Sequence, residues 1–149
     1  MSLTKALLSG LVGAGVLSLL NESARQLIND APRLDVLGKR AIALPLLKAG
    51  QTPPNDNELY WISMSGDIAL NTLYYGLIAL DEKENAVRNG ALLGLAMGVG
   101  TVFLPKQLGL GNDTSARNEK TALMTVAWYL AGGLAAAAVY KTLSGETKN

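Results

Sequence analysis

Charged residues are nearly absent from four long stretches of this chain, and this segregation constrains the fold more than any other feature. The stretches are 6–21, 59–80, 89–105 and 121–140, and each carries at most one charge. In a soluble domain with about 25% charged residues, a 20-residue window would be free of charge only about 0.3% of the time. A bilayer imposes such segregation because charged side chains are costly in hydrocarbon. The sequence therefore predicts an all-α integral membrane protein, a bundle of four transmembrane helices that forms one domain over residues 1–149.

The expected helices follow from these stretches and from the polar residues at their ends. We expect membrane spans at 3–25, 58–80, 87–104 and 121–143. Residues 34–47 show apolar side chains at a helical period but are too few to span, which predicts a short amphipathic helix at the membrane interface. The first stretch also resembles a signal peptide. Glu22 would make a poor cleavage site after Ala24, so a retained helix is expected.

The composition excludes several kinds of chemistry. The chain has no cysteine and no histidine. Disulfides, thiolate nucleophiles, iron–sulfur ligation, histidine-ligated haem and Ser-His-Asp catalysis are therefore excluded. The formal net charge is +1, so nothing indicates a nucleic-acid partner. We predict no metal site and no cofactor, and membrane lipids as the surrounding partners.

Asp67 is the most informative single residue because it falls near the middle of the second stretch, close to the expected bilayer centre. Ser63, Asn71 and Tyr74 are placed at i−4, i+4 and i+7, so they share a helix face with it. Such a stripe must face protein or water. It predicts either a site for an ion, a proton or a substrate, or a hydrogen-bonded clasp between helices.

Basic residues gather near one expected membrane face. Arg25, Arg33 and Arg40 lie there together with Asn21 and two carboxylates, Glu22 and Asp35. Arginines in this setting could bind a lipid phosphate while a carboxylate acts as base. The alternative, which we favour, is a set of internal ion pairs such as Glu22 with Arg25, three residues apart on a helix.

Gly90, Gly94 and Gly98 follow one another at four-residue spacing in the third span. This GxxxG pattern predicts that another helix crosses closely. That helix could belong to the same chain, to a second copy in a homo-oligomer, or to a partner in a membrane complex.

Four strings resemble a group of short bacterial membrane proteins of unassigned activity. They are APRLDVLGKRA, NTLYY, LPKQLGLG and WYLAGG. The resemblance covers most of the chain. It implies a bacterial inner-membrane setting and carries over no functional residue.

Three functions remain open from the sequence. We favour a non-enzymatic protein that binds or conducts a small or lipidic ligand at a polar site within the bundle. A membrane enzyme acting on a lipid headgroup at the interface is the second hypothesis. A structural or assembly subunit of a membrane complex is the third. The candidate ligand-binding residues are Asp67, Asn71, Ser63, Tyr74, Arg25, Arg33 and Arg40.

Overall fold

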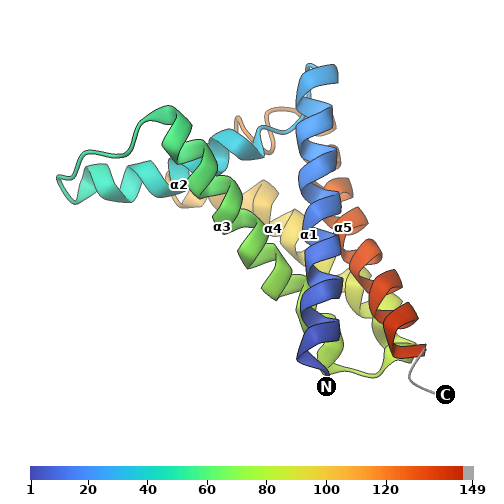
Figure 1. Cartoon of the computed structure of the whole chain (residues 1–149). Coiled ribbons are helices and arrows are strands. Elements are labelled where there is room, and N and C mark those ends of the chain that lie inside the picture. Colours follow the sequence, from blue (N-terminus) through green and yellow to red (C-terminus); the bar gives the residue numbers. More distant parts are fainter. Residues whose placement is uncertain (146–149) are drawn as a thin grey trace.

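The structure, a computed structural model, describes residues 1–145. All regular secondary structure in this part of the chain is helical (Figure 1). The α-helices are α1 Leu3–Leu27, α2 Leu34–Lys48, α3 Asp56–Gly76, α4 Ala86–Gln107 and α5 Glu119–Gly145. Two short 3-10 helices, η1 Leu77–Leu80 and η2 Lys83–Asn85, connect α3 to α4. No strand occurs within residues 1–145, so the prediction of an all-α chain is confirmed.

Helix α5 packs along both α4 and α1, and α3 packs against α1. Near the end of α1 that is remote from the N-terminus, α2 leaves the bundle sideways, and the chain returns through α3 (Figure 1). Helix α2 and the first half of α3 thus form an arm that diverges from the other helices.

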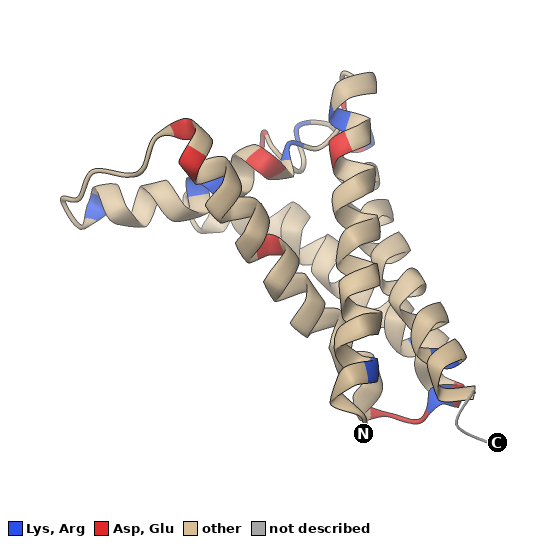
Figure 2. Cartoon of the chain, in the orientation of Figure 1, with Lys and Arg blue, Asp and Glu red and all other residues tan. Residues whose placement is uncertain are grey.

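Within residues 1–145, three helical segments are long and apolar enough to cross a membrane. They are Leu3–Leu27, Lys83–Gln107 and Glu119–Gly145, which correspond to α1, to α4 with η2, and to α5. Basic and acidic residues gather toward the ends of these helices and leave their middle parts uncharged (Figure 2). Many large apolar side chains are exposed on the isolated chain, among them Leu19, Leu92 and Leu123. Contact with lipid tails would be favourable for such a surface, whereas contact with water would not.

The predicted fourth span is not confirmed. Helix α3 is not apolar enough to join the other three. The polar stripe that contains Asp67 and Asn71 is the physical reason, because it lowers the apolarity of the whole segment. The regular helix also ends earlier than the expected residue 80, since Leu77–Leu80 form a 3-10 turn. The expected amphipathic segment does form a helix, α2, and none of its residues is buried.

Glycines allow the central helices to approach closely. A Cβ atom at Gly94 would lie 2.6 Å from the backbone oxygen of Tyr129 on α5. A Cβ atom at Gly98 would lie 2.8 Å from the Cα atom of Val126, and one at Gly90 would overlap the backbone oxygen of Gly133. These three glycines therefore face α5 of the same chain. A second copy or a membrane-complex partner at Gly90, Gly94 and Gly98 stays a prediction.

Local signals position the helix that carries Asp67. Asn55 caps α3 by accepting a hydrogen bond from the backbone N–H of Glu58 at 2.9 Å. The Glu58 side chain accepts one in return from the Asn55 N–H at 3.3 Å. This capping box satisfies backbone donors that a helix leaves free at its start. It fixes where α3 begins.

Candidate functional site

A partly open cavity of about 120 Å³ lies between α1, α2 and α3, and Tyr129 of α5 contributes to its wall. We call it the polar cavity. Its polar lining residues come from all three helices: Ser18, Asn21 and Glu22 on α1, Asp35 on α2, and Ser63 and Asp67 on α3. The remaining lining is mostly apolar, including Leu17, Leu34 and Met64. An apolar wall with a few convergent polar groups is typical of small-ligand sites.

Asp67 is exposed where α3 meets the polar cavity. Its carboxylate is held by Asn71, one turn further along, whose Nδ2 donates to Asp67 Oδ1 at 3.0 Å and to the Asp67 backbone oxygen at 2.9 Å. No basic side chain within residues 1–145 forms an ion pair with Asp67. The carboxylate is thus oriented by an amide but not neutralised by a cation.

Three acceptor atoms beside the cavity have no hydrogen-bond partner among the described residues. They are Ser18 Oγ, Asn21 Oδ1 and Glu22 Oε1, all buried. Asn21 as a whole is only 6% exposed. These residues are spaced i, i+3 and i+4, so they share one face of α1. Leaving such an atom buried and unpaired costs about 1–3 kcal/mol, and a bound hydrogen-bond donor would remove that cost.

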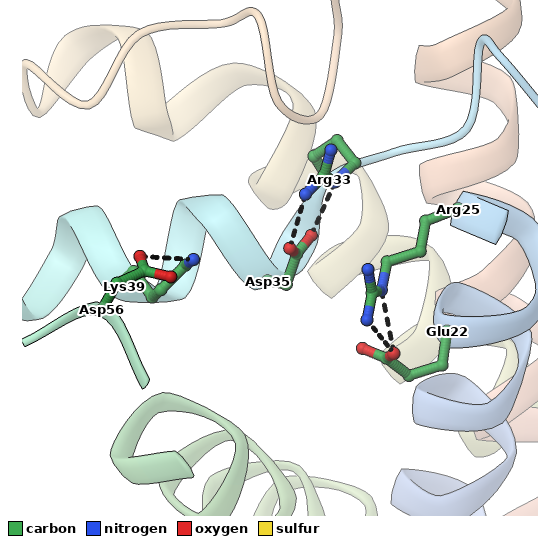
Figure 3. Close-up of polar contacts among 6 residues, drawn as sticks. All are labelled: Glu22, Arg25, Arg33, Asp35, Lys39 and Asp56. Carbon is green, nitrogen blue, oxygen red and sulfur yellow. Dashed lines mark hydrogen bonds and ion pairs between the residues drawn. The ribbon is translucent and has the colours of Figure 1, made fainter. Parts of the chain in front are cut away.

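Two ion pairs lie beside the cavity (Figure 3). Arg25 Nη2 lies 2.6 Å from Glu22 Oε2, which confirms the predicted pair on α1. Arg33 holds Asp35 with two hydrogen bonds, from Nε at 3.0 Å and from Nη2 at 2.8 Å. The Asp35 side chain is only 5% exposed. Each arginine in Figure 3 therefore has its own carboxylate partner.

The electrostatics of Asp35 follow from this pairing. Burial alone would raise the pKa of its carboxyl group, but the hydrogen bonds and the charge of Arg33 outweigh it, and the net pKa is lowered. The same bonds raise the pKa of Arg33. The pair is therefore charged on both sides and formally neutral in sum.

The structure separates the predicted site residues into distinct groups. Ser63 and Asp67 line the polar cavity, and Asn71 orients Asp67. Tyr74 lies elsewhere: its hydroxyl donates to the backbone oxygen of Leu93 on α4 at 2.9 Å. The residues expected to form one stripe therefore lie in two different parts of the bundle.

The predicted arginine cluster is divided as well. Arg40 pairs with Asp113, in the loop that follows α4, at 2.7 Å and 3.0 Å, and also donates to the Leu110 backbone oxygen at 3.1 Å. It does not line the polar cavity. Its role is to fasten α2 to the loop between α4 and α5.

Sequence reasoning missed Ser18. A serine inside an apolar stretch carries no signal alone. Its spacing from Asn21 and Glu22 places the three on one face of a helix, and that pattern could have identified the α1 wall of the cavity.

A second, largely apolar groove of about 370 Å³ lies between α2, α3 and α4. Its walls include Ala96, Met97, Gly100 and Leu104 of α4 together with Tyr74 of α3. We call it the apolar groove. Leu37, Ala41 and Tyr129 line both this groove and the polar cavity, so the two are adjacent.

Within residues 1–145, no group of three or more His, Cys, Asp or Glu side chains is placed to hold a metal ion. Comparison of the chain with protein-family models, with curated proteins and with solved structures finds no match.

Proposed function

We propose that this chain is an integral membrane protein that binds a small ammonium group in the polar cavity, with Asp67 as its counter-charge. The observation that carries the proposal is the combination of one carboxylate without a cationic partner and three buried acceptors without donors around the same space. A site with unused acceptors and a negative charge is complementary to a cation that carries N–H donors.

The charges beside the cavity support a cation over an anion. Glu22 with Arg25 and Arg33 with Asp35 are formally neutral pairs. Asp67 then leaves the surroundings with one negative charge. An ammonium ion would neutralise it and would supply three donors to acceptors such as Asn21 Oδ1 and Ser18 Oγ. The volume of about 120 Å³ suits a group of a few heavy atoms, since a cavity of about 150 Å³ accommodates benzene.

We propose that α1, α4 and α5 span the bilayer and that α3 is a fourth, more polar span. Ile62, Leu70 and Leu73 are exposed on α3 and would face lipid, while Asp67 faces the cavity. The arm helix α2, which leaves the bundle sideways and pairs Lys39 with Asp56, would lie at the interface. We propose a bacterial inner membrane as the setting, which is what the sequence resemblance implies.

The pairing of the arginines weighs against the lipid-headgroup enzyme. Such an enzyme would need guanidinium groups available to a phosphate. Arg25, Arg33 and Arg40 each already bind a carboxylate, and exchanging that partner for phosphate would leave the carboxylate unpaired. A purely structural subunit would have no need for an Asp67 carboxylate that lies beside a cavity without a cationic partner.

Ethanolamine is a suitable probe because it is a small ammonium compound with an additional hydroxyl group. We expect calorimetric titration of the protein in phosphatidylcholine nanodiscs to detect its binding at neutral pH. Ethylene glycol, of the same size but uncharged, should not bind. Asp67→Asn should weaken ethanolamine binding by about 10- to 100-fold, the value of a charge-assisted hydrogen bond.

Asp56→Asn is the matched control, because the Asp56 side chain is 86% exposed and lies outside the cavity. It should bind ethanolamine as the unaltered protein does. Absence of ethanolamine binding, or equal binding by the Asp67→Asn variant, would show that the cavity is not an ammonium site.

A further inference from the structure

The polar cavity and the apolar groove differ in how their polar atoms are satisfied. In the groove, the Tyr74 hydroxyl donates to the Leu93 backbone oxygen and the Thr101 hydroxyl donates to the Met97 backbone oxygen at 2.8 Å. The groove therefore presents a surface that behaves as apolar. In the polar cavity, by contrast, acceptors such as Asn21 Oδ1 remain unused. One space is suited to a charged head and its neighbour to a hydrocarbon chain.

The two spaces are adjacent and share part of their lining. Leu37 and Ala41 of α2 and Tyr129 of α5 contribute to both. A molecule with its head beside Asp67 could thus extend past these side chains toward α4. Small residues there, Ala96 and Gly100, leave room for a chain.

The groove also opens outward near the end of α4. Leu104 and Leu108, which line it, are 53% and 65% exposed on the isolated chain. Because α4 is one of the segments apolar enough to span a bilayer, this opening would face hydrocarbon. A ligand could enter from the lipid phase.

We propose that the polar cavity and the apolar groove together bind one membrane amphiphile, with a primary ammonium head beside Asp67 and a single hydrocarbon chain along α4. This inference rests on the proposed ammonium site and names the kind of molecule that fills it. The head provides the selectivity. The chain gains little by leaving lipid for the groove, because lipid tails are as apolar as the groove wall.

Photolabelling in phosphatidylcholine nanodiscs tests this placement. The probe is a dodecylamine derivative with a diazirine in the second half of its chain, and the control probe is the corresponding alcohol. Mass spectrometry should find the amine attached to residues 96–104 of α4 well above the alcohol. Asp67→Asn should reduce the amine to the level of the alcohol at these residues.

Gly100→Leu fills the groove without disturbing the helix, because a Cβ atom there would meet only Leu104 Cδ1 at an ordinary 3.5 Å. It should remove the α4 labelling and leave ethanolamine binding unchanged. Gly66→Leu is the matched control, since a Cβ atom at Gly66 has no neighbour within 4 Å and the residue lines neither cavity. This variant should be labelled as the unaltered chain is. Ala96→Phe provides a second way to fill the groove should Gly100→Leu not fold.

The outcomes distinguish this inference from the proposed function. If ethanolamine binds through Asp67 but the amine and the alcohol label α4 equally, the proposed amphiphile binding is wrong while the proposed ammonium site is supported. Labelling of α4 that survives both groove-filling variants would likewise overturn the chain placement. If ethanolamine does not bind at all, the proposed function and this inference fail together.

Discussion

The Ser115 hydroxyl donates a hydrogen bond of 2.6 Å to the backbone oxygen of Thr101. Thr101 stands four residues before Pro105, which lies inside α4 and has no N–H to offer that oxygen. Ser115, which is fully buried, replaces the missing donor. The loop after α4 thus repairs the helix at its proline, and α4 continues to Gln107 rather than ending near residue 104 as the sequence predicts.

Ser115→Ala should destabilise the fold by about 1–3 kcal/mol, because it leaves a buried carbonyl without a donor. Pro105→Ala returns the backbone N–H that this carbonyl lacks. The double variant should therefore lose less stability than Ser115→Ala alone when both are measured by thermal unfolding in detergent. If the effects of the two changes on stability were strictly additive, the Ser115 hydroxyl would not be replacing the donor that Pro105 lacks.

Gly94→Leu should lower the unfolding temperature, because any Cβ atom there meets the α5 backbone at 2.6 Å. Separating α4 from α5 to make room costs about 1–3 kcal/mol or more. Gly66→Leu, which has open space around it, should leave the unfolding temperature nearly unchanged. Size-exclusion chromatography of the same samples adds the test for a partner: a smaller apparent size of Gly94→Leu alone would show that association of copies depends on the packing of α4 against α5.

Much of the helical architecture could be predicted from the sequence, because the length of an apolar run and its polar ends fix where a membrane helix starts and stops. The Glu22–Arg25 pair was predictable for a similar reason, since its geometry is set by helical spacing alone. The Arg40–Asp113 pair was not predictable. Its members are separated by 73 positions, and their proximity depends on how α2 is placed over the loop after α4.

The candidate site, too, could be predicted from the sequence only where the contact lies within one helix. Asp67 stands out in an apolar stretch, and Asn71 lies one turn away, so their contact follows from helix geometry. The partners of this stripe on other helices depend on the angle at which α3 diverges from α1. That angle directs Ser63 and Asp67 toward the polar cavity and Tyr74 toward α4, a division that spacing within one helix does not reveal.

The Arg33–Asp35 pair predicts how stability depends on pH. The folded pKa of Asp35 lies below its ordinary value of 3.8, so the unfolded chain binds the proton more readily. The contribution of the pair to stability is then complete above about pH 4 to 5 and is lost as pH falls through the lower folded pKa. Asp35→Asn should be less stable than the unaltered chain at pH 6, and the difference should narrow below pH 3.8. Unfolding temperatures measured across this range check it, and a difference that does not change with pH would contradict it.

The unpaired acceptors of α1 predict a conflict between stability and binding. Ser18→Ala removes a buried hydroxyl oxygen that has no partner among the described residues, and Asn21→Leu replaces an amide whose oxygen has none by an apolar group of similar size. Both changes should raise the unfolding temperature and increase the free energy of unfolding by about 1 kcal/mol. The reason is that each removes a buried polar atom that forms no hydrogen bond in the folded state. Both should also weaken ethanolamine binding if these atoms accept hydrogen bonds from the ammonium group.

Thr125→Val provides the contrast, because the buried Thr125 hydroxyl is hydrogen-bonded to the backbone oxygens of Ser115 at 2.7 Å and Thr121 at 3.0 Å. The same kind of change there should lower the unfolding temperature and leave binding intact. Unpaired buried atoms also occur away from the cavity, for example Ser9 Oγ and Thr114 Oγ1, so the binding measurement decides whether the α1 atoms form a site. If Ser18→Ala and Asn21→Leu destabilise the chain as Thr125→Val does, the α1 acceptors have partners within the fold, and the hydrogen-bonding part of the site is wrong.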